Sequence, residues 1–471
     1  MTAKNQDSSN PPEVLVQELY QKREKIYPRE VHGLFAALRV TGVSVLLGLY
    51  YVLPWLLWDG RQAILFDLPE RKFYILGMIF WPQDFIYLTL MLVLAALSLF
   101  FFTALAGRLW CGFACPQTVW TEAFLWIERK IEGSRQRQMK LDKSPWNSNK
   151  LLKKGSKHLI WIVFSLFTGL TFVGYFSPIR DLFAAVPLLA LGPWEWFWII
   201  FYSFATYGNA GWMREQVCIY MCPYARFQSA MIDKDTLVIS YDKSRGEPRG
   251  SRKKGIDPES LNLGSCIDCS ICVQACPTGI DIRDGLQYEC IGCAACIDAC
   301  DDVMDKMGYA PGLIKYTSEN SMETGIKYRL FRPRIIIYAS ILIALFIGTI
   351  FAIAIREPLE LDIIRDRNSL FRETGNGLIE NVYTLKIINK DIIEHQYELQ
   401  ITGLEGMKFH LQKKEISAAA GQVTEMPLRI EIDPVNLKQR SSQIFFNLKT
   451  LNSDVSIVEE ARFLGPFPDR N

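Results

Sequence analysis

Long apolar runs separated by charged connections dominate the first three quarters of the chain. Four of them approach the roughly 20 residues that a helix needs to cross a bilayer core of about 30 Å. A fifth is shorter and begins beside Glu195 and two prolines. Because only helices and closed barrels satisfy their own backbone hydrogen bonds in lipid, the pattern predicts a helical membrane bundle of about five spans. These spans are expected near residues 38–57, 85–106, 159–176, 194–207 and 335–355.

The pattern changes after residue 357 to short runs rich in β-branched and aromatic residues. Examples are residues 382–388, 397–401 and 443–448, with turn-forming clusters between them. About seven such runs in this region predict an immunoglobulin-like β-sandwich. The alternative is a small β-domain of another topology.

Charge predicts how the chain is oriented. With 52 Lys and Arg against 50 Asp and Glu, the net charge of +2 gives no reason to expect a nucleic-acid partner. Residues 108–157 carry eleven of the basic residues, whereas residues 177–193 carry only Arg180. Since basic connections stay in the cytoplasm, the N-terminus and residues 208–334 are expected there. Five spans then put residues 357–471 in the periplasm, and the lysines of 150–157 are expected to face lipid headgroups.

All twelve cysteines lie between Cys111 and Cys300, and eight of them form two runs of C-x2-C-x2-C-x3-C. This spacing is typical of ferredoxins with two [4Fe–4S] clusters, in which the fourth cysteine of each run ligates the other cluster. The first cluster would therefore take Cys266, Cys269, Cys272 and Cys300. The second would take Cys276, Cys290, Cys293 and Cys296. The alternative for such spacings is a pair of zinc sites.

The other four cysteines form two C-x3-C-P motifs, each after an apolar run. A spacing of four residues puts both sulfurs of a motif on one helical face. Because a span followed by such a motif occurs twice, the first two spans and the next two resemble two copies of one helical hairpin. If this internal repeat brings the motifs together, they offer four thiolates: Cys111, Cys115, Cys218 and Cys222. The candidates for this site are a third [4Fe–4S] cluster, a copper ion, or a dithiol without metal. The alternative is that these cysteines are buried as small apolar side chains.

Several segments together resemble the CcoG/FixG/RdxA family of accessory proteins for assembly of cbb3-type cytochrome c oxidase. They are residues 27–30, 110–120, 222–228 and 231–237. The resemblance implies a bacterial inner-membrane protein that reduces Cu(II) to Cu(I) for the oxidase. The implied partners are copper ions, a cytoplasmic electron donor, and oxidase-assembly or copper-transport proteins. The C-x3-C-P motifs also resemble those of membrane subunits that pass electrons between quinol and periplasmic reductases.

The sequence thus predicts a membrane-bound iron–sulfur electron carrier with cupric reductase activity, although no catalytic residue can be assigned. The alternatives are a quinol-linked conduit to a periplasmic reductase and a non-redox scaffold for oxidase assembly. The expected organisation is a cytoplasmic arm (1–34), a four-helix membrane region (35–240), a ferredoxin module (241–334), a fifth transmembrane helix (335–356) and a periplasmic immunoglobulin-like domain (357–471).

Overall fold

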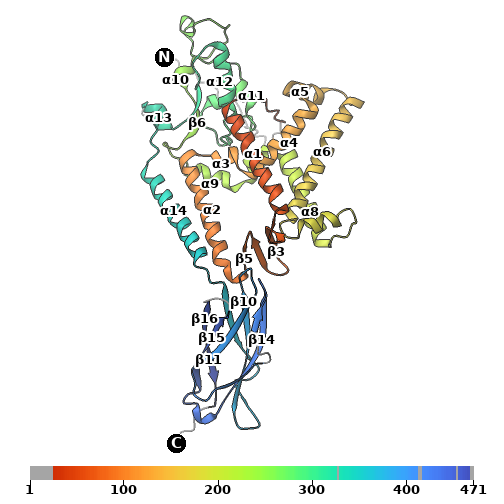
Figure 1. Ribbon diagram of the computed structural model, residues 1–471. Helices are drawn as coiled ribbons and strands as arrows, with labels where there is room; N and C mark the ends of the chain where they lie inside the picture. The colour runs from red at the N-terminus through yellow and green to blue at the C-terminus, as the bar shows by residue number, and fades with distance from the viewer. Residues whose placement is uncertain (1–24, 326–327, 412–415, 452–454, 467–471) are drawn as a thin grey trace, which may run out of the picture.

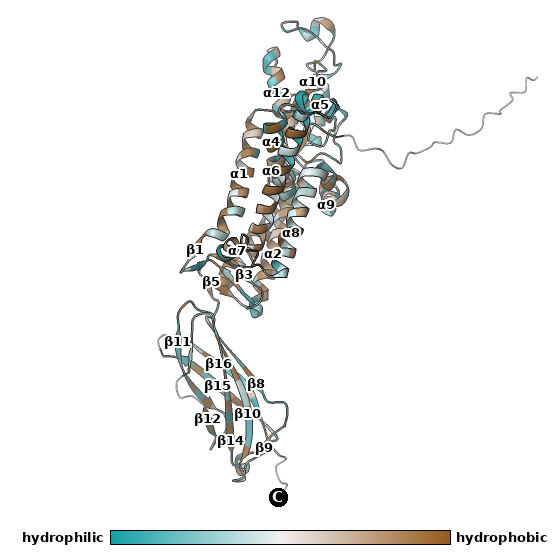
Figure 2. Ribbon diagram, turned by 90° about the vertical axis from the view of Figure 1, so that its right-hand side faces the viewer, coloured by the Kyte–Doolittle hydropathy of each residue, from teal (hydrophilic) through white to brown (hydrophobic). Residues whose placement is uncertain are grey.

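The computed structural model describes residues 25–325, 328–411, 416–451 and 455–466. Its apolar helices lie between the cysteine-rich region at one end and a β-rich region at the other (Figure 1). Within the described residues, four helical segments are long and apolar enough to cross a membrane. They contain the helices α1 (Leu34–Val52), α2 (Phe85–Ala106), α6 (Ser148–Val173) and α14 (Pro333–Ala354). The chain is therefore associated with a membrane, and the hydropathy colouring of Figure 2 shows many hydrophobic residues along α1 and α6.

The expected fourth span is a shorter helix, α8 (Pro193–Thr206). It is not among the four long apolar segments, but it continues directly into a π-helix, η3 (Tyr207–Met213). Helix α8 packs along α6, and α14 packs along α2. Helix α6 also contacts α1 and the helix Pro116–Glu132, which connects the first half of the membrane region to the second.

Helix α6 begins at Ser148, well before the expected start of the third span. The side chain of Asn147 caps it by accepting a hydrogen bond from the Lys150 backbone N–H at 2.8 Å. The lysines of 150–157 suggested a connection outside the helix, because a charged segment is unfavourable next to lipid. In the structure Lys154 and Lys157 pair with acidic side chains and Lys150 donates to the backbone carbonyls of Asp142 and Ser144, so the helix can start before them.

Short helices connect the long ones on the side of the cysteine-rich region. The membrane part has α3 (Leu109–Phe113), α4 (Pro116–Glu132), α5 (Arg135–Lys143), the π-helix η4 (Val217–Met221) and α9 (Pro223–Met231), with α7 (Ile179–Ala185) at the other end. The cysteine-rich region is closed by the antiparallel pair β6 (Val238–Tyr241) and β7 (Ile314–Thr317). Between them lie α10 (Lys243–Gly246), η5 (Pro258–Leu261), α11 (Ile271–Ala275), η6 (Ile282–Asp284) and α12 (Ala295–Met307), and α13 (Glu319–Thr324) follows.

The connection between α1 and α2 contains strands that the sequence pattern did not predict. After η1 (Leu53–Trp55) come β1 (Leu57–Trp58), β2 (Arg61–Gln62), β3 (Ile64–Asp67), β4 (Lys72–Ile75) and β5 (Met78–Phe80), then η2 (Pro82–Asp84). Ile79 and Trp81 pack against Ile388 of the C-terminal region. The Asp84 carboxylate pairs with Arg356 at 2.5 Å and Lys390 at 3.0 Å. This connection therefore holds the β-rich region against the helices.

The C-terminal region has nine strands within the described residues, arranged in two antiparallel sheets. One sheet has the order β12-β14-β10-β8, with β9 added to β10, and the other has the order β13-β11-β15-β16. Both sheets contribute to one core that includes Tyr383 and Phe446. The strands are β8 (Leu359–Arg365), β9 (Arg372–Glu373), β10 (Ile379–Asn389), β11 (His395–Thr402), β12 (Lys408–Leu411), β13 (Ile416–Ala418), β14 (Val423–Ile432), β15 (Ser441–Thr450) and β16 (Ser456–Leu464); η7 (Pro434–Asn436) follows β14.

Candidate metal centres

The eight cysteines of the two long runs line two small cavities. One cavity is lined by four thiols that include the last cysteine of the second run: Cys266, Cys269, Cys272 and Cys300. The other is lined by four that include the last cysteine of the first run, with Cys272 at its edge: Cys276, Cys290, Cys293 and Cys296. These are the same two sets that the ferredoxin spacing predicts. Within the described residues, no three cysteine, histidine or carboxylate side chains form a group that could hold a single metal ion.

The same backbone conformation occurs in both runs. In the first, Asp268 and Ser270 have positive φ angles of 52° and 54°. In the second, the equivalent Gly292 and Ala294 have φ angles of 68° and 59°. Residues with positive φ turn the chain sharply, so each C-x2-C-x2-C segment wraps around its cavity before α11 or α12 begins. Gly292 adopts this conformation without strain because it has no Cβ.

Burial decides the chemistry of these thiols. It raises the pKa of Cys272 to about 11 and that of Cys293 and Cys300 to about 12. A buried thiol of this kind is neutral and unreactive, whereas a metal ligand must be a thiolate. Iron would supply the positive charge that compensates for burial of the thiolates. Four thiols around each cavity therefore fit a [4Fe–4S] cluster, and of the eight only Cys269 is exposed.

Each C-x3-C-P motif is broken between its cysteines, so the prediction that both sulfurs lie on one helical face is wrong. Cys111 lies in α3, but Cys115 is the N-cap of α4, with ψ of 131°. Cys218 lies in η4, and Cys222 is the N-cap of α9, with ψ of 111°. The reason is the proline that follows each motif: it occupies the first helical position and forces the preceding cysteine into an extended conformation.

The internal repeat extends to the backbone before each motif. Gly107, four residues before Cys111, has φ of 55° and ψ of −117°. Arg214, four residues before Cys218, has φ of 48° and ψ of −113°. Glycine adopts these angles without strain, but arginine does not. Both motifs therefore leave their preceding helix through the same turn.

The thiols of the two C-x3-C-P motifs influence one another's pKa. Burial raises the pKa of Cys111 to about 12, and the neighbouring Cys115 and Cys218 raise it further. Burial raises the pKa of Cys218 to about 11, with contributions from Cys115 and Cys222. Cys111 and Cys115 of the first motif thus lie within electrostatic range of Cys218 and Cys222 of the second motif, although the described thiols form no group of three that could hold a single metal ion. That the four cysteines share one site stays a prediction.

This thiol group lies directly against the second cavity. Cys111 and Cys218 pack against the buried cluster that contains Cys293. A Cβ atom added to Gly112 would lie 2.5 Å from the Gly292 carbonyl oxygen, so α3 touches the Cys293 loop backbone to backbone. In addition, Arg39 donates to the Cys293 carbonyl at 2.6 Å. The membrane motifs and the cysteine-rich region thus share one interface.

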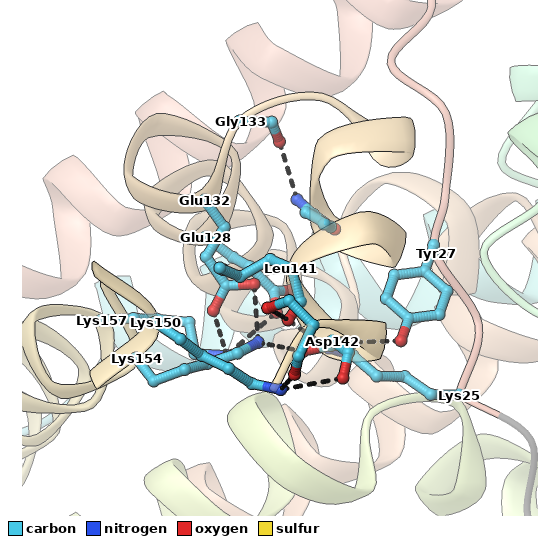
Figure 3. A network of polar contacts seen from close by, with 12 residues as sticks. Lys25, Tyr27, Glu128, Glu132, Gly133, Leu141, Asp142, Lys150, Lys154 and Lys157 are labelled. Atoms are coloured by element: carbon cyan, nitrogen blue, oxygen red, sulfur yellow. Dashed lines mark hydrogen bonds and ion pairs between the residues drawn. The ribbon is translucent and has the colours of Figure 1, made fainter. Parts of the chain in front are cut away.

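A buried network of charges that was not predicted from the sequence includes Glu128, Glu132, Lys154 and Lys157 (Figure 3), and Glu128 connects it to Arg214. The Glu128 carboxylate pairs with Arg214 at 2.7 Å and with Lys157 at 3.2 Å. Burial alone raises the pKa of Glu128, but the positive charges of Arg214 and Lys157 outweigh it and lower the pKa to about 2. Lys154 pairs with Glu132 at 2.9 Å. The expectation that the lysines of 150–157 face lipid headgroups is therefore wrong for Lys150, Lys154 and Lys157, whose amino groups bind carboxylates or backbone carbonyls inside the protein.

The N-terminal segment closes this network. Lys25 and the Tyr27 hydroxyl both donate to Asp142, at 2.9 Å and 2.6 Å. The Arg135 guanidinium donates to the Tyr27 carbonyl at 2.9 Å. The segment that begins with Tyr27 thus connects α5 to the Cys293 region, where Arg29 N–H donates to the Gln274 carbonyl at 2.8 Å.

Three family models match the chain. A 4Fe-4S dicluster domain matches residues 213–319, and a 4Fe-4S binding domain matches residues 88–133. The model described as an IG-like fold at the C-terminus of FixG matches residues 349–466. Over 466 residues the chain is 37% identical to nitrogen fixation protein FixG of Rhizobium meliloti, covering 91% of this chain and 87% of that protein.

The chain belongs to the FixG/RdxA/CcoG family. Protein RdxB of Cereibacter sphaeroides is 39% identical over 414 residues, which are 85% of this chain and 87% of RdxB. The crystal structure of a FixG-related protein from Vibrio parahaemolyticus is 35% identical over 23% of this chain and 97% of that chain, with a TM-score of 0.22. As a member of the FixG family with two matching 4Fe-4S models, the chain is an iron–sulfur electron-transfer protein.

Proposed function

We propose that the chain holds three [4Fe–4S] clusters and carries single electrons between the cysteine-rich region and the membrane surface. Two clusters would occupy the cavities of the ferredoxin module, with the crossed ligand sets given above. The third would be held by Cys111, Cys115, Cys218 and Cys222. The observation that carries this proposal is the backbone contact between Gly112 and Gly292, because it puts the third thiol group against the second cavity.

The occupant of the third site is proposed to be iron–sulfur rather than copper. The 4Fe-4S binding model matches residues 88–133, whose only cysteines are Cys111 and Cys115. A cubane cluster needs four thiolates, and the other two come from the second motif. The pKa coupling among the four thiols supports this pairing. Cubane clusters exchange one electron at a time over a wide range of potentials.

The three thiol sets form a continuous series, which supports a role as an electron conduit. Cys272 lines both cavities of the ferredoxin module, so the two sites adjoin. Cys293 of the second cavity contacts the third set. The exposed Cys269 marks the end that a soluble electron donor can approach. The other cysteines of the series are buried or half-buried.

We infer Cu(II) as the electron acceptor, a substrate that the chain reduces to Cu(I) for assembly of cbb3-type oxidase. The support is the family resemblance, together with the softness of thiolate sulfur, which favours the reduced ion. In the proposed orientation, the N-terminus and all three clusters face the cytoplasm of the bacterial inner membrane, and residues 357–471 face the periplasm. The quinol-linked conduit and the non-redox scaffold are the competing functions.

Metal analysis of anaerobically purified protein tests the clusters. The parent chain should contain about twelve iron atoms and as much sulfide. Cys111→Ser, Cys218→Ser and the double variant should each fall to about eight, because the four thiols act as one site. Met221→Ser is the matched control, since Met221 adjoins Cys222 but is exposed and lies outside the proposed ligand set. Stoichiometric zinc, or an unchanged iron content in the double variant, would contradict the proposal.

Copper reduction is tested separately in cells grown with limiting copper. Cys222→Ser should lower oxidase activity several-fold while the ferredoxin module keeps its iron, and added copper should restore part of the activity. Met221→Ser should behave like the parent. If Cys222→Ser supported full oxidase activity at limiting copper, the copper role would be abandoned, whereas loss of activity that copper cannot restore would favour the scaffold.

A further inference from the structure

A large cavity lies where the helices meet the cysteine-rich region. Its volume is about 1100 Å³, enough for a ring-sized head group and part of a tail. One face of α1 lines it with mostly small side chains, including Ala37, Thr41 and Ser44. Helices α4 and α6 form the opposite wall, and loops of the ferredoxin module form the far end. The helices concerned are adjacent in Figure 2.

The cavity opens toward the lipid. Three apolar residues of its lining are also well exposed on the outside of the helices: Val40 is 60% exposed, Trp126 is 56% exposed and Ile160 is 44% exposed. They belong to α1, α4 and α6, and two of these helices are long enough to span the membrane. An apolar molecule dissolved in the bilayer can therefore enter between them.

The inner end of the cavity reaches the proposed redox sites. Cys218 of the third thiol set and Cys293 of the second cavity both line it. A molecule that enters this cavity from the membrane would lie beside both residues. Cluster binding alone does not require such a cavity, whereas electron exchange between the clusters and a membrane molecule does.

One polar atom in the cavity wall has no partner. The Nε–H of Arg129 is buried, and no described residue accepts a hydrogen bond from it. The same guanidinium donates through Nη2 to Glu122 at 2.8 Å, so its position is fixed. By contrast, Gln117 donates to the Asn209 carbonyl at 2.9 Å and Thr118 donates to the Cys111 carbonyl at 2.5 Å. Since buried donors normally have partners, Arg129 points to an acceptor on a ligand.

We propose that this cavity binds a membrane quinone, with a ring oxygen accepting from Arg129 Nε–H and the tail leaving between α1 and α4. The proposal rests on the three-cluster function and names its partner in the membrane. A quinone combines an apolar body, carbonyl acceptors and redox chemistry, and a phospholipid lacks the last. Oxidation of one quinol to quinone releases two electrons and two protons, so it requires two one-electron acceptors. The three proposed clusters supply these acceptors, and Glu122 beside Arg129 is a carboxylate through which the protons can pass to water.

Equilibrium binding of radiolabelled decylubiquinone to the full-length, cluster-loaded protein in lipid nanodiscs tests the proposal. Ser44→Phe fills the cavity from α1 and should weaken binding at least tenfold. Val45→Phe is the matched control, because Val45 is 54% exposed and does not line the cavity. Arg129→Lys keeps the positive charge but removes Nε–H and should weaken binding about tenfold. Arg137→Lys on α5 should bind like the parent.

A second readout is the paramagnetic resonance spectrum of the reduced protein, which should change shape when decylubiquinone is added to the parent but not to Ser44→Phe. Equal binding by all four variants, or full displacement of the quinone by added phosphatidylglycerol, would overturn the proposal. Iron content measured on the same samples separates the two hypotheses: a chain with about eight irons refutes the third cluster, whereas twelve irons without variant-sensitive binding refutes the quinone site.

Discussion

Arg214 combines a strained backbone with a buried ion pair. Its φ of 48° is costly for a residue with a side chain, yet the same turn is made by glycine in the first copy of the repeat. The guanidinium donates to the Gly211 carbonyl at 2.9 Å and pairs with Glu128 at 2.7 Å. These contacts hold the turn that leads to Cys218. Glu128 therefore acts as a positioning residue for the second C-x3-C-P motif.

Glu128→Gln should destabilise the protein by about 3 kcal/mol at neutral pH, because Arg214 and Lys157 lose their buried counter-charge. The pKa of Glu128 is lowered in the folded state, so its stabilisation is present above the ordinary glutamate pKa and disappears as pH falls toward about 2. The unfolding midpoints of parent and variant, followed by helical circular dichroism, should thus converge on acidification. Acid damage to clusters affects both proteins equally. Glu323→Gln on the exposed face of α13 should match the parent at every pH, and a constant difference for Glu128→Gln would exclude the charge explanation.

The contact between helix α3 and the Cys293 loop determines whether the third thiol group and the ferredoxin sites form one electron-transfer system or two separate ones. A Cβ at Gly112 would clash with the Gly292 backbone, and one at Gly292 would be tight against Arg108, 3.1 Å from its carbonyl oxygen. Two glycines on elements far apart in sequence thus allow the two backbones to touch.

Gly112→Ala should push α3 away from this loop, at a cost of about 1–3 kcal/mol from overpacking. The expected result is a lower unfolding midpoint and a loss of magnetic coupling between the third cluster and the ferredoxin clusters, measured by paramagnetic resonance. Gly48→Ala is the control, because a Cβ at this position of α1 meets nothing within 4 Å. Unchanged coupling in Gly112→Ala would show that the contact does not set the distance between the sites.

At the scale of the molecule, the cysteine-rich region and the C-terminal sheets lie at opposite ends of the apolar helices (Figure 1). Helix α14 runs from one to the other, from Arg332 at its N-cap to the residues before β8. Asp84, paired with Arg356 and Lys390, connects the start of α2 with the end of α14 and the β-rich region. This arrangement supports the proposed orientation, because one membrane crossing separates the two ends.

Fusions to alkaline phosphatase, which is active only in the periplasm, test the orientation. A fusion after Asn471 should be active, and one after Gly250, before the ferredoxin cysteines, should be inactive. A fusion of a cytoplasm-active reporter at the same two positions should give the opposite pattern, which controls for expression. Activity after Gly250 would exclude a cytoplasmic ferredoxin module.

Features that depend on local patterns can be predicted from the amino-acid sequence alone. Apolar runs predict four of the long helices, because a membrane demands uninterrupted apolar surface. The eight-cysteine spacing predicts which thiols share a cavity, because a short loop fixes where neighbouring sulfurs can reach. The family resemblance, carried by the motifs, is confirmed by relatives that cover most of the chain.

Features that depend on contacts between residues far apart in the sequence could be recognised only in the tertiary structure. The early start of α6 and the pairing of its lysines require Glu128, Glu132 and Asp142, which come from other helices. The strands before α2 are short and are stabilised partly by packing against Ile388, so no local pattern marks them. The break in each C-x3-C-P motif could be predicted from its proline, but the packing of Cys111 and Cys218 against the cluster that contains Cys293 could not. A spacing of four residues constrains one turn of chain, whereas the folded membrane region brings the two motifs to one place.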